Sequence, residues 1–323
     1  MEVILNNQWF ERRKECPACT SDGFKTIYQS RYDEPPIKNY LVEFYSPQGT
    51  VEFEYLSEAA YVLCECDVGG LIFQRDIPNK VLMEKLYGQW IDPQQALIRH
   101  QKQDDLGYHS HNAQEIMQII SHFRKKPSSI RFLDFGMGWG EWALMAKAFG
   151  CESYGTDLSS DRREHAQSNG IKVIMWDEIP QHRFDFINTE QVFEHIPDPL
   201  RTLLHLRKAL KTNGILKISV PDANDIKRQL KIMDWKAPRG SRNSLNSVAP
   251  LEHINCFRRT SLRKMASEAQ MEEVFIPLTV QYSHTTNWSG PKRIAKNILL
   301  PLYRNLLMKQ NYIFLRNLHE NKD

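Results

Sequence analysis

The sequence lacks long hydrophobic runs, a strong excess of either charge, and an N-terminal segment of the secretory type. Its most apolar late stretch, residues 298–302, is far shorter than the roughly 20 residues that a membrane span needs. A formal net charge of +3 over 323 residues does not by itself indicate a nucleic-acid partner. The first residues join no basic flank to an apolar run. We therefore expect a cytoplasmic protein without a membrane span.

Cysteine is also scarce, and its spacing is more informative than its number. In a chain without an export signal, disulfides are rare. The six cysteines comprise two close pairs and two single residues: Cys16 and Cys19, Cys64 and Cys66, Cys151, and Cys256. Close pairs of this kind are typical of a metal site.

The composition that remains is ordinary for a globular protein, with 41% hydrophobic and 25% charged residues. Three segments differ in texture. Residues 1–105 hold the cysteine pairs and strand-like runs at 51–55 and 71–73, which predicts a small β-rich unit. Residues 106–285 alternate helical and strand patterns, which predicts an α/β domain. Residues 286–323 are basic and amphipathic, which predicts a helical extension.

The middle segment predicts a Rossmann-like, doubly wound sheet, because short apolar runs alternate with helical periodicity. Helices are expected over residues 112–125 and 143–147, and from Pro199 to a stop at Gly214. Five strands are expected: residues 130–135, 153–157, 171–175, 184–188 and 215–220. In such sheets, ligands bind beyond the carboxyl ends of the strands.

A glycine-rich loop follows the first of these strands, with Gly136, Gly138 and Gly140 in alternate positions. A dinucleotide-binding loop would place its third glycine at position 141, where this sequence has Glu141. An acid there would repel a pyrophosphate at a helix start. S-adenosylmethionine carries a sulfonium and an ammonium instead of a phosphate, so the loop favours a methyl donor over a nicotinamide.

Acidic residues close the next two strands. Asp157 ends the second strand, where its carboxylate can accept hydrogen bonds from both ribose hydroxyls. Asp177 follows the third and is placed to reach the adenine amino group, with Met175 or Trp176 beside the ring. The complete set expected to bind the cofactor is Asp134, Gly136, Met137, Gly138, Gly140, Asp157, Leu158, Asp177, Glu190 and Gln191.

Four motifs in order resemble those of class I S-adenosylmethionine-dependent methyltransferases of the type 11/23-like group. The glycine loop at 133–140 resembles their first motif, and residues 191–199 resemble the Glu-His-x-x-Asp-Pro segment after the fourth strand. Residues 213–221 resemble the segment that opens the fifth strand, and residues 250–257 a later His-x-x-x-Phe element. The resemblance implies a seven-stranded sheet and S-adenosylmethionine as cofactor.

The catalytic group is expected among His195, His253 and Glu194. A hydroxyl acceptor needs a base, and histidine is the commonest base near neutral pH. The alternative is that Glu194 and His195 only cap the helix at Pro199. Ubiquinone-pathway O-methyltransferases similar to this segment carry a metal-binding glutamate where this chain has Gln191, which argues against that metal here.

The two cysteine pairs resemble the zinc knuckles that precede many such methyltransferase domains. Cys16 and Cys19 form a Cys-x-x-Cys knuckle, but the second knuckle has Gly69 where its last cysteine would stand. Cys64 or Asp67 would then have to supply the fourth ligand. Joint binding by Cys64 and Cys66 is feasible, since residues two apart on a strand face the same way. A structural zinc on Cys16, Cys19, Cys64 and Cys66 and a knuckle without metal both remain open.

The predicted function is methyl transfer to a small-molecule acceptor, a hydroxyl of a sugar or glycan precursor or of a secondary metabolite. The alternatives are a non-catalytic binder of the same cofactor, a nucleic-acid methyltransferase and a nicotinamide dehydrogenase. The nucleic-acid alternative is weak because residues 188–191 offer no proline and no aromatic ring to stack a flipped base. The basic C-terminal stretch has Lys292, Arg293, Lys296 and Arg304 among leucines and isoleucines. Two interpretations stay open: peripheral contact with an anionic membrane surface, and the more common packing of such a stripe on the parent domain or a partner helix.

Overall fold

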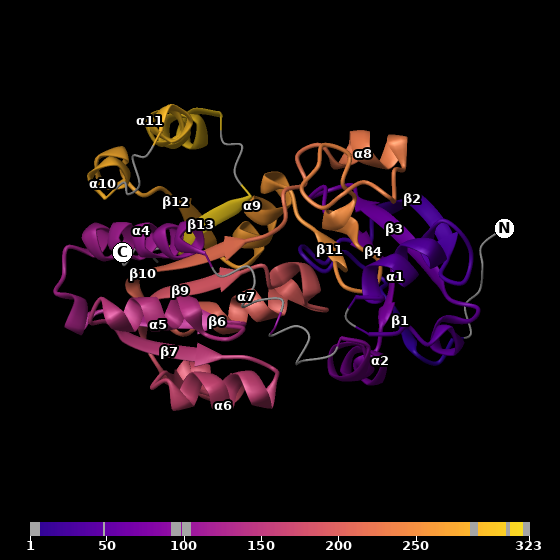
Figure 1. Ribbon diagram of the computed structural model, residues 1–323, viewed down its shortest axis with the longest axis horizontal. Helices are drawn as coiled ribbons and strands as arrows, with labels where there is room; N and C mark the ends of the chain where they lie inside the picture. The colour runs from indigo at the N-terminus through magenta and orange to yellow at the C-terminus, as the bar shows by residue number, and fades with distance from the viewer. Residues whose placement is uncertain are drawn as a thin grey trace. The chain divides into compact units, whose positions relative to one another are not determined.

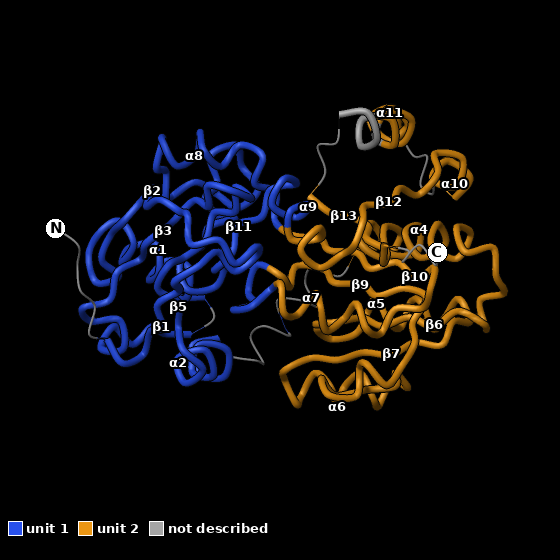
Figure 2. Tube along the Cα trace, turned by 180° about the vertical axis from the view of Figure 1, so that it is seen from behind, with its two compact units in different colours: residues 1–104, 194–199, 221–264 blue, residues 105–193, 200–220, 265–323 orange. Residues whose placement is uncertain are grey.

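The computed structural model describes residues 7–47, 49–91, 98, 105–284, 290–307 and 311–318. It divides into two compact units, each built from three segments of the chain (Figure 2). Unit 1 comprises Met1–Asp104, Glu194–Pro199 and Pro221–Lys264, and unit 2 comprises Asp105–Phe193, Leu200–Val220 and Met265–Asp323. The first predicted boundary lies next to the end of the first segment of unit 1. The prediction of three consecutive domains missed that two later segments return to that unit.

Unit 2 contains a seven-stranded sheet with the order β12-β13-β10-β9-β6-β7-β8 (Figure 1). The pairs β6–β7, β7–β8, β6–β9 and β9–β10 are parallel, whereas β13 runs antiparallel to both β10 and β12. The strands are β6 (Arg131–Phe135), β7 (Glu152–Thr156), β8 (Lys172–Val173), β9 (Phe184–Glu190), β10 (Leu210–Ser219), β12 (Met271–Val274) and β13 (Tyr312–Asn317). The α/β fold predicted for residues 106–285 is confirmed.

Helices α4 and α5 cover one face of this sheet. Ile116 and Ile119 on α4 and Trp142 on α5 pack against Phe132 and Phe186 on the central strands, and all five side chains are buried. The helices of unit 2 are α4 (Leu106–Phe123), α5 (Glu141–Ala148), α6 (Ser160–Ser168), α7 (Pro199–Arg207), α9 (Arg259–Glu268), α10 (Leu278–Ser283) and α11 (Pro291–Leu307), with single turns η3 (Pro127–Ser129), η4 (Trp176–Gln181) and η5 (Phe193–His195) at or near its strand ends. Two of these elements, α7 and α9, run across the boundary with unit 1, and η5 lies at it.

Two expectations for unit 2 were wrong in detail. The helix that opens at Pro199 ends at Arg207, not at Gly214, because β10 already begins at Leu210 and pairs there with Phe184 before its register shifts. The segment predicted as a helical extension supplies β13, which is the central antiparallel strand between β10 and β12. Antiparallel pairing with two distant strands leaves no local pattern in residues 312–317 that would have indicated it.

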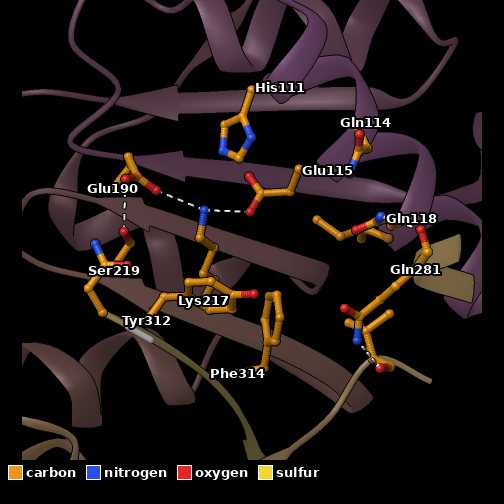
Figure 3. Close-up of a pocket in the computed structure, with 13 residues that line it drawn as sticks. His111, Gln114, Glu115, Gln118, Glu190, Lys217, Ser219, Gln281, Tyr312 and Phe314 are labelled. Atoms are coloured by element: carbon orange, nitrogen blue, oxygen red, sulfur yellow. Dashed lines mark hydrogen bonds and ion pairs between the residues drawn. The ribbon is translucent and has the colours of Figure 1, made fainter. Parts of the chain in front are cut away.

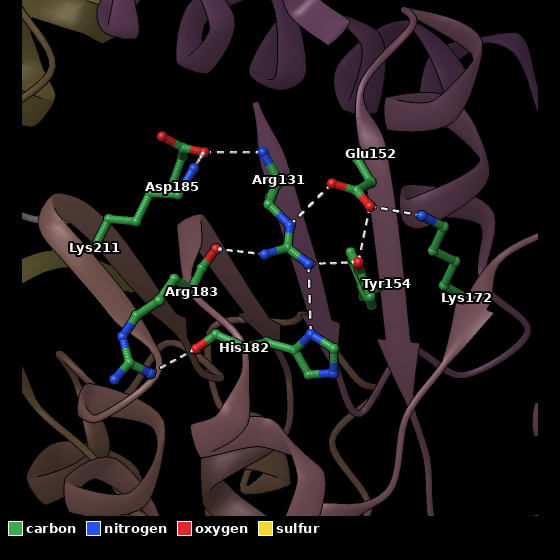
Figure 4. A network of polar contacts seen from close by, with 8 residues as sticks. All are labelled: Arg131, Glu152, Tyr154, Lys172, His182, Arg183, Asp185 and Lys211. Atoms are coloured by element: carbon green, nitrogen blue, oxygen red, sulfur yellow. Dashed lines mark hydrogen bonds and ion pairs between the residues drawn. The ribbon is translucent and has the colours of Figure 1, made fainter. Parts of the chain in front are cut away.

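The amino ends of the central strands are joined by ion pairs (Figure 4). Asp185 on β9 is buried and accepts hydrogen bonds from Lys125 Nζ at 2.8 Å, from Lys211 Nζ at 2.6 Å and from the Arg131 backbone N–H at 2.9 Å. These partners lower the pKa of Asp185 although burial opposes them. Because this edge is opposite the one where such sheets bind ligands, Asp185 has a structural role.

Helix α11 is a continuous helix, although Pro301 was expected to interrupt it. Its apolar side chains Ile294, Ile298 and Leu299 are exposed, by 39%, 47% and 60%. The side chains of Arg304, Leu306 and Leu307 lie outside the described part. No helix within the described ranges is long and apolar enough to cross a bilayer. Contact of α11 with a membrane surface stays a prediction.

Unit 1 is built around a four-stranded antiparallel sheet with the order β11-β4-β3-β2, together with the small pair β1–β5. Its strands are β1 (Phe10–Arg12), β2 (Phe24–Arg31), β3 (Ala60–Cys66), β4 (Ile72–Gln74), β5 (Asp76–Pro78) and β11 (Asn255–Cys256). Its helices are α1 (Ile37–Tyr45), α2 (Lys80–Lys85) and α8 (Ile226–Ile232), with single turns η1 (Phe53–Leu56), η2 (Leu86–Trp90) and η6 (Asn246–Val248). Tyr61 and Trp235 lie in its core, 5.8 Å apart by ring centroids.

Residues 51–55 alternate apolar and polar side chains, but they do not form the predicted strand. Phe53–Leu56 is a single 3-10 turn. The sheet is formed by other segments, since strand β3 pairs with β2 and β4. The apolar side chains of residues 51–56 reach the core from this turn. An alternating pattern of only five residues is compatible with a strand or with such a turn, and tertiary packing decides which of them forms.

Candidate functional site

The glycine loop lies between the end of β6 and the start of α5, at the carboxyl edge of the sheet. All three glycines have positive φ, and Gly136 has no room for a side chain, since an added Cβ would lie 2.6 Å from Val192 Cγ2. An added Cβ at Gly138 would meet no atom within 4 Å. The backbone at Gly138 therefore borders open space that a ligand can approach closely.

Asp157 points at this loop. The parallel pairing of β6 and β7 places Thr156 opposite Phe135, so the next residue of each strand leaves the sheet side by side. Asp157 Oδ2 accepts a hydrogen bond from the Gly138 N–H at 3.0 Å, and Oδ1 accepts one from the Ser159 N–H at 2.9 Å. Leu158 beside it is 98% exposed, an unusual position for a leucine and one that suits contact with an apolar ligand face.

Asp134 lies beneath the loop and is buried. Burial raises its pKa to about 7, with Glu190 and Glu141 adding to the rise, while a hydrogen bond from Asn188 Nδ2 at 2.9 Å and the charge of Lys217 oppose it. A carboxyl group with a pKa this high becomes fully ionised when a cation arrives. Asn188 was not predicted as a site residue, because an asparagine inside an apolar strand gives no motif.

The third predicted strand end differs from the expectation. Asp177 is the second residue of the short 3-10 helix η4 and is exposed. The Trp176 ring stacks on His205, with centroids 3.8 Å apart and planes at 8°. Met175 is half exposed, and its N–H donates to Glu178 Oε2 at 2.6 Å. The sequence did not predict the contact of Trp176 with His205, since these two residues belong to separate elements.

Glu190 is the last residue of β9 and Gln191 follows it, and the two residues make different contacts. Glu190 accepts hydrogen bonds from Lys217 Nζ at 2.8 Å and Ser219 Oγ at 2.8 Å, so its carboxylate is held over β10. Gln191 has a φ of 54° and is exposed, and its N–H donates to the Ser219 carbonyl at 3.0 Å. A non-glycine residue in the left-handed region at this strand end is typical of a functional edge.

Glu194, His195 and His253, the three candidates for the catalytic group, come together in unit 1. Their ligand-capable atoms all lie within 4.8 Å of one another, a geometry that would also suit a metal ion. His195 Nδ1 donates to the Glu252 carbonyl at 2.9 Å, and His253 Nδ1 donates to the Asn246 carbonyl. His195 Nε2 lies 3.8 Å from Glu194 Oε1.

Both imidazoles are neutral at physiological pH, because burial lowers their pKa values to about 4 for His195 and about 3 for His253. With Nδ1 protonated and bound to a carbonyl, each ring keeps its lone pair on Nε2. Tyr87 Oη lies 3.1 Å from His195 Nδ1, and the sequence gave no indication of this contact. Tyr87 precedes His195 by more than a hundred residues, so only the fold could place it there.

Three cysteines converge in unit 1, not four. The sulfur atoms of Cys16, Cys19 and Cys66 lie within 4.8 Å of one another. The inclusion of Cys64 was wrong, because its sulfur faces Thr26 Oγ1 on the neighbouring strand at 3.8 Å. Cys66 ends β3, where the chain turns back and the Gly69 N–H donates to its sulfur at 3.3 Å. A Cβ added at Gly69 would lie 3.8 Å from Cys19 Sγ, so position 69 stands where a fourth thiolate would be.

Residues 108–274 match the family of methyltransferase domains. The chain belongs to this methyltransferase family. It is a class I enzyme that depends on S-adenosylmethionine, as the resemblance of its motifs implied. The match runs over the glycine loop, the strand that ends at Asp157 and both histidines of the cluster. It excludes the nicotinamide dehydrogenase considered from the sequence.

Curated relatives are about a quarter identical to this methyltransferase over the residues that align. The ubiquinone biosynthesis O-methyltransferase of Cereibacter sphaeroides is 24% identical over 190 residues, which cover 52% of this chain and 76% of the relative. That of Glaesserella parasuis is 27% identical over 142 residues, covering 38% and 60%. Among solved structures, the plantazolicin methyltransferase BpumL in complex with SAH is 14% identical, with a TM-score of 0.45, and covers 73% of this chain and 94% of that chain.

Proposed function

We propose that this methyltransferase transfers a methyl group to a hydroxyl of a small molecule, of the class of sugar or glycan precursors or secondary metabolites. The observation that carries the proposal is the pair of neutral histidines, each with its Nδ1 hydrogen fixed by a backbone carbonyl. A hydroxyl acceptor requires a base, whereas a free amine does not need one to the same extent. Two of the curated relatives are named as O-methyltransferases, which agrees with this choice.

The residues of the carboxyl edge fit the cofactor. The glycine loop offers bare backbone beside open space, and Asp157 is positioned to accept hydrogen bonds from the ribose hydroxyls. Asp134 and Glu141 supply negative charge on the side where the sulfonium and ammonium groups would lie. When bound, S-adenosylmethionine supplies a methyl group that its sulfonium already activates.

The histidine cluster would serve as the base. His195 or His253 takes the hydroxyl proton on Nε2, whose lone pair is available because Nδ1 carries the hydrogen. The Glu194 carboxylate is 1% exposed and lies 3.8 Å from His195 Nε2, so it would stabilise the imidazolium that forms. The remaining task of the protein is to hold the acceptor oxygen in line with the methyl group.

The test is a transfer assay with S-adenosylmethionine labelled in its methyl group. The purified protein is incubated with panels of hydroxylated sugars and secondary metabolites, alongside amine analogues of the same size. The proposal expects the label in an ether linkage that resists hydrolysis. A label found only on nitrogen or carbon, or cofactor binding without transfer to any extract component, would contradict it; the second outcome would favour the non-catalytic binder.

Cofactor affinity is expected to rise with pH between 6 and 8, because Asp134 has a pKa of about 7 and must be ionised to pair with a cation. Binding at pH 6 should release protons, which calorimetry in buffers of different ionisation enthalpy would measure. The same raised pKa makes ionised Asp134 destabilising, so the protein without cofactor should unfold at a higher temperature at pH 6 than at pH 8. In Asp134→Asn, both pH dependences should disappear.

We also propose that Cys16, Cys19 and Cys66 hold a structural zinc ion through three thiolates. Zinc prefers four ligands in a tetrahedron, and the three converging sulfurs provide three of them. Such an ion would join the N-terminal knuckle to the end of β3 and so stabilise unit 1.

Elemental analysis of the purified protein should find about one zinc per chain. Cys66→Ser is expected to lose the metal and several degrees of melting temperature. Cys64→Ser is the matched control, because its sulfur lies outside the cluster, and it should keep the metal. Equal metal content in both variants would contradict the assignment.

A further inference from the structure

A polar cavity of about 150 Å³ lies within unit 2, under α4 and over strands β10 and β13 (Figure 3). We call it the Lys217 pocket and define it by Glu115, Glu190, Lys217, Ser219 and Tyr312, which all line it. Its lining includes Glu190 and Ser219, the last residues of β9 and β10, so the pocket reaches the edge of the sheet that carries the glycine loop. Of the residues predicted to bind the cofactor, it contains Glu190.

The centre of the pocket is a buried lysine between two carboxylates. Lys217 Nζ lies 2.6 Å from Glu115 Oε1 and 2.8 Å from Glu190 Oε2, and the lysine side chain is 4% exposed. Glu115 also accepts a hydrogen bond from Trp142 Nε1 at 3.0 Å, and Glu190 accepts one from Ser219 Oγ at 2.8 Å. The pKa of Lys217 is raised and that of Glu115 is lowered by their mutual attraction, so both are charged.

This network is costly for the fold. Strands buried in a parallel sheet are near-continuous apolar runs, and Lys217 interrupts such a run between Leu216 and Ile218. Burying the Lys217 and Glu115 charges, whose side chains are 4% and 15% exposed, costs more than their pairing returns in many proteins. A leucine at position 217 would pack the sheet against α4 without this cost. We therefore infer that the buried charges serve to bind a ligand.

The two carboxylates of the Lys217 pocket can accept further hydrogen bonds. Each carboxylate has about four lone-pair directions, of which the contacts above use two, while Lys217 has three N–H groups, of which they use two. The carboxylates of Glu115 and Glu190 together carry one charge more than Lys217 neutralises, and Asp134 interacts electrostatically with Lys217 and Glu190. His111 lines the pocket as well and interacts electrostatically with Glu115. A ligand rich in N–H and O–H groups with a positive charge would complement this pocket.

We propose that the Lys217 pocket binds the acceptor through a protonated amine and neighbouring hydroxyls, which selects acceptors of the amino-sugar class over neutral and acidic sugars. The ammonium group would contact Glu190, whose side chain is 49% exposed, and the hydroxyls would contact Ser219, Gln118 and Tyr312. The rings of Tyr312 and Phe314 line the same cavity and suit the apolar face of a sugar. This assignment of the acceptor rests on the proposed methyl transfer.

The experiment titrates the protein, saturated with S-adenosylhomocysteine, with glucosamine, glucose and glucuronate at pH 7. Glucosamine is expected to bind about tenfold more tightly than glucose because of its charge-assisted hydrogen bond, and glucuronate should not bind. Glu190→Gln should raise the dissociation constant for glucosamine about tenfold and leave that for glucose near its original value. Glu164→Gln on the exposed face of α6 is the matched control and should change neither.

Three outcomes would overturn the assignment: glucosamine no tighter than glucose, no binding of either sugar, or an effect of Glu164→Gln equal to that of Glu190→Gln. Competition between glucosamine and S-adenosylhomocysteine would also overturn it, since the pocket would then belong to the cofactor. If S-adenosylhomocysteine itself fails to bind, the failure lies with the proposed function. If S-adenosylhomocysteine binds but the protein shows no preference for the amine, only the assignment of the pocket is contradicted, and the proposed function stands.

Discussion

Asp157→Ala is expected to raise the dissociation constant for S-adenosylhomocysteine about a hundredfold or more. At the proposed cofactor site the variant would lose two charge-assisted hydrogen bonds to the ribose, each of which contributes about 1.5–3 kcal/mol. It also removes the acceptor for the Gly138 N–H, so the glycine loop loses the contact that fixes it in the absence of ligand. Titration calorimetry with the wild type and the variant measures the change directly.

Two further variants make this result specific. Asp157→Asn keeps an oxygen for the loop but loses the charge, so its affinity should fall between those of the wild type and the alanine variant. Asp161→Ala changes an aspartate in the first turn of α6, four residues away, and should leave the affinity near that of the wild type. Equal affinities for Asp157→Ala and Asp161→Ala would remove the basis for placing the ribose at this strand end.

His195→Gln is expected to lower kcat by about a hundredfold to ten-thousandfold while leaving affinity for S-adenosylhomocysteine near that of the wild type. Glutamine fills a similar volume and can still donate a hydrogen bond to the Glu252 carbonyl, but it cannot accept the hydroxyl proton. His253→Gln tests the second candidate in the same way. The variant with the larger loss in kcat identifies the base, and the other histidine is then a positioning residue.

The pH profile separates catalysis from a structural role. Because burial lowers the pKa of His195 to about 4, the neutral base persists well below neutral pH, and kcat should stay level down to about pH 5. The loss that Asp134 causes near pH 7 should appear only in the KM for S-adenosylmethionine. An acid limb in kcat with a midpoint near 6.5 would show that the base is an ordinary exposed histidine elsewhere.

The cofactor edge could be predicted because its signals are local. The glycines of residues 136–140 follow a strand directly, and Asp157 ends the next strand, so chain order and sheet order coincide there. The departure of Glu141 from the dinucleotide pattern favoured a methyl donor over a nicotinamide without any knowledge of the fold. Loop chemistry of this kind depends on the backbone of a few consecutive residues, which the sequence displays fully.

The contacts of the histidine cluster could not be predicted because they depend on backbone atoms far along the chain. The sequence identified His195 and His253, but the carbonyls that fix their tautomers belong to Glu252 and Asn246. A carbonyl is present at every residue, so no motif marks the one that will accept. Tyr87 likewise reaches His195 only once three segments of the chain have assembled into unit 1.

Lys217 could have been recognised from the sequence. A single cation in the apolar run 215–220 contradicts the burial that the run predicts, and such a contradiction between levels is typical of functional positions. Its ion-pair partners were harder to predict from the sequence, since Glu115 lies in a helix about a hundred residues earlier. The zinc prediction was wrong at Cys64 for a related reason. The spacing along a strand predicts which face of the sheet a side chain lies on, but it does not predict which residue of the neighbouring strand that side chain contacts.

The position of β13 constrains the order in which the protein can assemble during synthesis. Strand β13 lies between β10 and β12, so both of these strands expose unpaired backbone until Tyr312–Asn317 has left the ribosome. The nascent chain therefore carries an open edge on β10 from Ser219 onward, and a second on β12 from Val274 onward, until β13 has been synthesised. Open edges invite pairing with other chains, so production in cells should depend on chaperones more than the stability of the finished protein would suggest.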